Sequence, residues 1–155
     1  MARKQPFGIV DVLLIVVIIG LTISLWYVIW SPGRQLAFEE DMKWESRARM
    51  SALRTAQIEY YNEKETYASD MDTLIHFVRD SLSQQRIDSV FTDRLYLTAF
   101  SFDSIRHTPK SLRTYVLAVD DTSALHRYSI VDPDGYGTVS SLLNADDHNR
   151  ASWEQ

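Results

Sequence analysis

The chain has 155 residues, with 16 Lys and Arg against 21 Asp and Glu, and it contains no cysteine. The missing cysteines exclude disulfides, zinc–cysteine sites, iron–sulfur clusters and thiol nucleophiles. The net charge of −5 argues against a nucleic-acid partner, which would need a basic face. The length suits one membrane segment followed by one small domain.

The first element is a long apolar run at residues 7–30, preceded by a short flank at 1–6. At 1.5 Å per residue, a helix over this run is about 36 Å long and would cross a hydrocarbon core of about 30 Å. Trp26, Tyr27 and Trp30 gather at its far end, where aromatic rings favour the membrane interface. The run is too long for a signal peptide, and no A-x-A-like site follows it. We therefore expect a retained transmembrane helix that contacts lipid.

Asp11 is the one charged residue inside this run. On helical geometry it lies about 6 Å from Phe7 along the axis, near the amino-terminal interface. Two interpretations stay open at this point. The carboxylate reaches the headgroups or pairs with Arg3 or Lys4, or it pairs with a cation on another subunit, as intramembrane charges often do. Cations flank the run almost equally on both sides, so charge does not orient it.

A polar helix is predicted directly after the apolar run. Ser31 is a suitable N-cap, and the Pro-Gly pair that follows it should break or kink the path, so a new helix is expected at about 33–64. Apolar residues recur at three- and four-residue steps mainly from Met50 onward. We expect residues 31–49 to form a stalk that is solvated or contacts a partner, and the helix from Met50 to pack on the domain.

The remainder of the chain changes from helical to strand-like spacing. Residues 69–82 carry one apolar stripe and predict a short helix, with Ser69 or Asp70 as its cap. Alternating patterns predict four antiparallel strands, the second and third forming a hairpin, at 94–102, 112–120, 126–132 and 138–143. The architecture is then α+β, with the long helix covering a small sheet in a domain at 50–143, followed by a polar tail at 144–155.

We find no catalytic constellation in the sequence. The histidines have no H-E-x-x-H or similar spacing, no serine lies in G-x-S-x-G, and no glycine-rich phosphate loop is present. The histidines are His76, His107, His126 and His148. We expect a protein that is not an enzyme and has no organic cofactor.

Four carboxylates near the carboxyl end form a candidate metal site. Asp132 and Asp134 lie in the turn sequence DPDGYG, and Asp146 and Asp147 follow. Calcium takes six to eight oxygen ligands, which these side chains and nearby carbonyls could supply, although the spacing is not that of an EF-hand. The alternative is a turn that its aspartates stabilise without a metal.

The stretch PFGIVDVLLIVVIIG at residues 6–20 resembles the amino terminus of type IV pilins and type II secretion pseudopilins. Phe7 stands at the family's first mature residue, Asp11 stands where the family has its glutamate, and Ile-Ile-Gly closes the motif at residues 18–20. Residues 50–78 are similar to the family's late first helix. The late acidic sequence is weakly similar to the end of major pseudopilins, some of which bind calcium there.

This resemblance implies a pilin-like domain outside the cytoplasm, anchored by one helix in the bacterial inner membrane, so that the domain is periplasmic. In the family, the glutamate meets the freed amino terminus of a neighbouring subunit. Here Pro6 replaces the glycine after which the family is cleaved, which argues against processing before Phe7. Without that cleavage, the amine that the family places beside the Asp11 position does not exist.

Three functional hypotheses follow. The first is a structural subunit whose transmembrane helix and stalk dock into a larger membrane complex of the cell envelope, for example as an accessory subunit of a respiratory or photosynthetic complex. The second is a working pseudopilin or minor pilin of a type II secretion or type IV pilus machine. The third is an enzyme or sensor whose site the sequence does not reveal.

Overall fold

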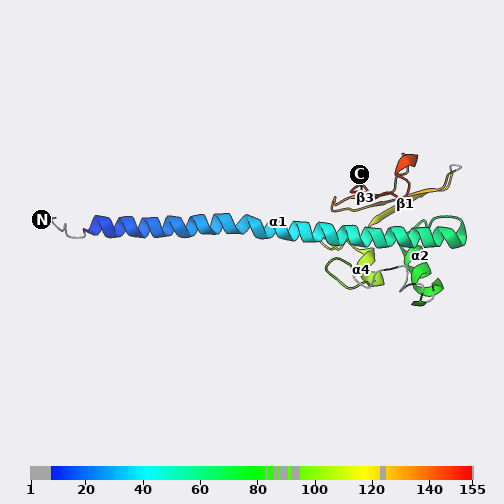
Figure 1. Cartoon of the computed structure of the whole chain (residues 1–155), viewed down its shortest axis with the longest axis horizontal. Coiled ribbons are helices and arrows are strands. Elements are labelled where there is room, and N and C mark those ends of the chain that lie inside the picture. Colours follow the sequence, from blue (N-terminus) through cyan, green and yellow to red (C-terminus); the bar gives the residue numbers. More distant parts are fainter. Residues whose placement is uncertain are drawn as a thin grey trace. The chain divides into compact units, whose positions relative to one another are not determined.

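The computed structural model describes residues 8–82, 84, 85, 87, 91, 95–122 and 125–154, except for the side chains of residues 30–32. Within these residues the fold is α+β, with a long helix, several short helices and a three-stranded antiparallel sheet (Figure 1). The chain divides into two compact units, Met1–Glu40 and Asp41–Gln155. Each unit is described by itself below.

The long helix, α1, spans Ile9–Lys64. Its helical conformation continues through residues 31–33, so the predicted break after the apolar run is wrong. A proline inside a helix removes one hydrogen bond and crowds a carbonyl, at a cost of about 3 kcal/mol. The helical residues on both sides outweigh that local cost, and the end of the helix falls where the sequence predicted it.

Two short helical segments follow α1. Helix α2, Met71–His76, begins at Asp70, whose side chain accepts a 2.8 Å hydrogen bond from the backbone N–H of Thr73. The segment η1, Phe77–Ser81, continues it with wider π-helical turns. The predicted short helix and its Asp70 cap are confirmed.

The predicted first strand, at 94–102, does not form over residues 95–102; residue 94 lies outside the described residues. Two of its groups bond to a helix side chain instead: the Leu97 N–H and the Thr98 hydroxyl both donate to Glu45 of α1, each at 2.6 Å. Helix α4, Phe102–Arg106, then starts at a capping box formed by Ser101. Local alternation predicts a strand here because it takes no account of Glu45, which is more than 50 residues away in the sequence.

The sheet is made of β1, Val116–Asp120, β2, Arg127–Val131, and β3, Thr138–Val139, in that order. Strands β1 and β2 pair antiparallel, which confirms the predicted hairpin. The last strand is much shorter than the predicted 138–143. Ser140 has a φ of 58°, outside the strand region, and its N–H bonds to the carbonyl of Arg150 at 2.8 Å, which ends the pairing with β2.

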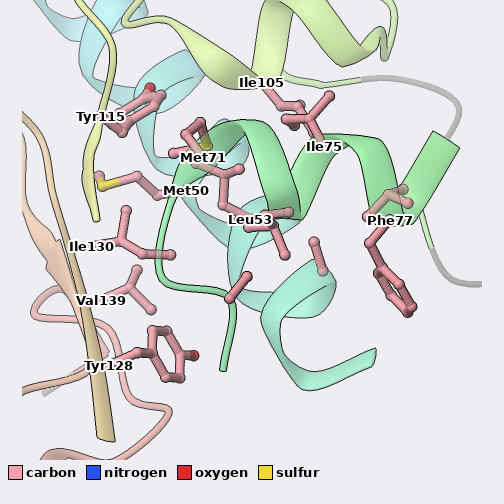
Figure 2. Close-up of a cluster of buried hydrophobic side chains, with 14 of the residues drawn as sticks. Met50, Leu53, Met71, Ile75, Phe77, Ile105, Tyr115, Tyr128, Ile130 and Val139 are labelled. Carbon is pink, nitrogen blue, oxygen red and sulfur yellow. The ribbon is translucent and has the colours of Figure 1, made fainter. Parts of the chain in front are cut away.

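The hydrophobic core of the second unit lies between α1 and the elements on its two sides. Met50 and Leu53 of α1 are fully buried. In Figure 2 they lie between sheet residues, such as Ile130, and residues of α2, such as Met71. Figure 1 shows the same order, with the sheet on one side of α1 and α2 and α4 on the other. The stripe predicted from Met50 onward therefore faces the core.

The compact unit also takes in residues that the sequence analysis assigned to the stalk and to the tail. Glu45 and Arg49 of α1 are buried, although they precede Met50. At the other end, Ala151 is buried and forms a β-bridge with Val139. The Arg54–Glu154 pair likewise joins α1 to the carboxyl end across 100 positions. Neither local composition nor periodicity reveals such contacts.

Candidate functional site

The amino-terminal part of α1 exposes all of its apolar surface. Every large apolar side chain between Ile9 and Ile29 is exposed in the first unit. Within the described part of the chain, α1 is the one helix long and apolar enough to cross a membrane. The rings of Trp26 and Tyr27 are exposed as well, whereas the side chain of Trp30 lies outside the described residues.

Asp11 caps its own helix, a local role besides the two interpretations given above. Its Oδ2 accepts a 2.9 Å hydrogen bond from the backbone N–H of Gly8, the residue just before α1. An acidic residue at the third helical position that bonds back to the capping residue is half of a capping box, and its charge also suits the positive end of the helix dipole. The spacing Gly-Ile-Val-Asp could have indicated this. Arg3, Lys4 and the Pro6–Phe7 bond lie outside the described residues.

In the second unit, buried Glu45 links α1 to the loop at 95–98. Its carboxylate accepts hydrogen bonds from Leu97, Thr98 and Arg49, the last at 2.9 Å. Burial alone would raise the pKa of this carboxyl, but these hydrogen bonds together outweigh it, so the pKa lies below its usual value. Arg49 also donates to the backbone carbonyl of His107 at 2.7 Å, which connects the same pair to the end of α4.

A second buried polar group links α1 to the sheet. The Ser46 hydroxyl lies 2.9 Å from the Tyr115 hydroxyl and donates to the Asp132 carboxylate. Burial raises the pKa of Tyr115, which keeps the phenol protonated. Asp132 also accepts a 2.6 Å hydrogen bond from the N–H of Asp134. These contacts join the start of the turn after β2 to the helix.

The four aspartates of the calcium hypothesis lie in two pairs, Asp132 with Asp134 and Asp146 with Asp147, and members of both pairs are bonded to other protein groups. The Asp134 carboxylate forms an ion pair with Arg113 at 2.8 Å. Burial alone would raise the pKa of Asp134, but hydrogen bonds from Ser111, Thr108 and Arg113 outweigh it and lower the pKa to about 2. Asp147 accepts a hydrogen bond from the Asn144 side chain beside Asp146, in the 3-10 turn η2, Ala145–Asp147. Within the described ranges, no three His, Asp or Glu side chains gather as a metal site would require. Calcium binding stays an untested prediction.

The histidines lie in different surroundings rather than around one centre. His76 contacts Asp80, His107 contacts Asp103, and His126 contacts Asp121. The Nε2 atom of His148 lies 3.1 Å from the hydroxyl of Tyr67, within a cluster of aromatic rings. No two of these histidines contact each other among the interactions of the described residues.

No protein-family model, curated protein or solved structure matches this chain. The pilin resemblance therefore rests on the sequence alone: the motif at residues 6–20, the similarity of residues 50–78, the weak similarity of the acidic end, and the order of the elements.

Proposed function

We propose that the protein is a non-enzymatic structural subunit, anchored by the apolar part of α1 in a bacterial inner membrane. In this proposal the pilin-like unit lies on the periplasmic side, and the chain docks into and braces a larger membrane-protein complex. An accessory subunit of a respiratory or photosynthetic complex is one form that such a protein could take.

The observation that carries the proposal is the exposed apolar surface between Ile9 and Ile29. A surface of this size is stable in contact with lipid chains or with other apolar helices, and unstable in water. Trp26 and Tyr27 at one end suit a membrane interface. Within the second unit, buried contacts from Glu45 and Ser46 hold its part of α1 to the loop at 95–98 and to Asp132, which suits a structural domain.

The test is purification of the tagged full chain from native membranes in a gentle detergent. We expect a fixed set of membrane proteins to accompany it in constant ratio through two further chromatographic steps. A chain that is recovered alone, or in the aqueous fraction after lysis, would overturn the proposal. A reporter enzyme fused to the carboxyl end and active only in the periplasm tests the orientation separately.

A working pseudopilin or minor pilin is the second candidate, and the motif around Phe7 and Asp11 favours it. Mass spectrometry of the native amino terminus separates the two candidates. A chain that begins at a methylated Phe7 would establish processing and support the pilin role. A chain that retains Arg3 and Lys4 would support the structural subunit.

A further inference from the structure

One arginine of α1 is held between two tryptophan rings in the second unit. The guanidinium carbon of Arg47 lies 5.3 Å from the ring centroid of Trp44 and 5.2 Å from that of Trp153. Its Nε donates to the backbone carbonyl of Tyr136 at 3.3 Å. We call Trp44, Arg47, Tyr136 and Trp153 the Arg47 cluster. It joins α1 to the turn after β2 and to the carboxyl end of the chain.

Arg47 differs from the other arginines of α1 in this unit. Arg49 pairs with Glu45 and Arg54 pairs with Glu154, each at 2.9 Å. Among the residues that the structure describes, no carboxylate pairs with Arg47. Because Nε is already bonded, the two Nη groups are the donors that a ligand would meet. Contacts with the indoles restrict the side chain, so little conformational entropy is lost when a ligand binds.

A guanidinium with this geometry suits a carboxylate, which it can bind through two parallel hydrogen bonds. The surrounding residue types indicate a protein ligand, because Trp, Tyr and Arg are the residues most enriched at the centres of protein interfaces. Trp44 is 45% exposed, and its indole offers apolar surface beside two cations, since Lys43 Nζ also lies 5.6 Å from the ring centroid.

An anionic lipid surface fits this unit less well. Lipid-binding patches usually carry four to eight Lys and Arg residues. The Arg47 cluster contains one arginine. One guanidinium is too few for a lipid-binding patch, but it suits a single carboxylate of a protein ligand.

We infer that the Arg47 cluster docks an acidic segment of the partner protein, with a partner Asp or Glu on the Nη groups of Arg47 and an apolar partner side chain on Trp44. This inference rests on the proposed function, because it specifies the chemistry of the partner that the membrane subunit braces.

The first experiment compares variants of the tagged full chain in the gentle-detergent purification. We expect Arg47→Gln and Trp44→Ala each to reduce the accompanying partner at least tenfold. Arg47→Lys should lie between them and the wild type, because an ammonium group cannot bind a carboxylate through a planar fork. The matched control, Arg54→Gln, removes an arginine that already has its own carboxylate and should keep the partner.

The second experiment maps the contact. The probe is the full chain carrying Trp44→p-benzoylphenylalanine, photolysed in native membranes and analysed by mass spectrometry. We expect a cross-link to a partner segment that contains Asp or Glu. A cross-link to lipid, to a second copy of the chain or to a segment without carboxylates would overturn the inference.

These outcomes separate the inference from the proposed function. If the wild type retains partners and Arg47→Gln retains them equally, the inference fails and the structural role stands. If the wild type has no partner, the proposed function fails and the inference falls with it. Circular dichroism melting of each variant shows whether the second unit is folded. If Arg47→Gln unfolds, Trp44→Ala still tests the inference, because Trp44 is exposed and its loss should leave the fold intact.

Discussion

The two halves of α1 carry similar apolar side chains in opposite surroundings. Ile18, in the amino-terminal half, is 52% exposed, whereas Leu53, in the carboxyl-terminal half, is fully buried. The first half is apolar on all sides, and among residues 8–40, the described part of its unit, no other sheet or helix packs against it. The second half is apolar along one stripe and carries polar groups, such as Glu45 and Arg47, that bond to the rest of its unit.

This difference shows that the pattern of apolar residues along one helix can suit one part of it to an apolar environment on all sides and another part to a protein core on one side. A buried aliphatic side chain contributes about 1.5–3 kcal/mol, but only where an apolar medium surrounds it. Residues 41–155 supply that medium from their own core, whereas in the proposed function residues 9–29 obtain it from lipid or from a partner helix. Substitutions in the two halves should therefore fail in different assays.

The largest effect is expected for Leu53→Asp. The substitution places an unpaired charge in the core beneath the sheet, which should cost more than about 4 kcal/mol and unfold the second unit. Loss of the near-ultraviolet circular dichroism of the full chain in detergent micelles measures it. The matched variant, Ile18→Asp, should leave that signal intact but reduce recovery in alkali-washed membranes. A Leu53→Asp chain that folds normally would show that the core has been assigned to the wrong face.

Glu45→Gln should destabilise the second unit by about 3 kcal/mol, because it leaves Arg49 buried without a counter-charge. Thermal melting should shift downward by roughly 10 °C or more. The control, Glu63→Gln, removes an exposed pair with Lys64, which is worth less than about 1 kcal/mol. Equal melting temperatures for the two variants would refute a bracing role for Glu45.

These two positions also show how far the sequence predicts the fold. The 3.6-residue period located Leu53 in the core, and local signals located the Asp70 cap and the hairpin. Glu45 was missed because its partners, Leu97 and Thr98, lie more than 50 residues away. The same carboxylate takes the Leu97 N–H, a backbone group that a strand over residues 95–102 could have paired with a neighbouring strand.

The candidate site was less predictable than the fold. The apolar run and its aromatic end follow from composition and length. The Arg47 cluster does not, because Trp44 and Trp153 are far apart in the sequence and only the folded chain brings both indoles to Arg47. The Asp11 cap is intermediate in predictability. The three-residue spacing from Gly8 to Asp11 is visible in the sequence, but the hydrogen bond between them is seen only in the structure.

Gly137→Ala should destabilise the carboxyl end of the second unit by about 2 kcal/mol. A Cβ at this position would lie 2.7 Å from the Trp153 ring, and the backbone φ of 152° disfavours other residues. Gly135→Ala is the matched control, because its φ of 83° gives backbone strain without a steric neighbour. We expect the larger decrease in melting temperature, and a larger change in tryptophan fluorescence, for Gly137→Ala. The reverse order would contradict the packing of Trp153.

Acid should weaken the second unit. The carboxyls of Glu45 and Asp134 have pKa values below their usual ones, so each stabilises the fold when ionised. That stability is present above pH about 4 and is lost as the pH falls toward about 2, where Asp134 titrates. Asp134→Asn should flatten this part of the stability profile, measured by urea unfolding between pH 2 and about 5. An unchanged profile would show that Asp134 does not drive it.

The smallest effect concerns Asp11, and it separates a cap from a charge pair. Asp11→Asn keeps an oxygen that can accept from the Gly8 N–H, so a cap should weaken by less than about 1 kcal/mol and the partners should still co-purify. Asp11→Leu removes the acceptor and should fray the first turn of α1, visible as faster amide exchange at residues 9–12. If Asp11→Asn alone releases the partners, the carboxylate pairs with a cation on another subunit, and its cap is secondary. The same substitution therefore decides whether the one charge in the apolar half of α1 serves its own helix or the assembly.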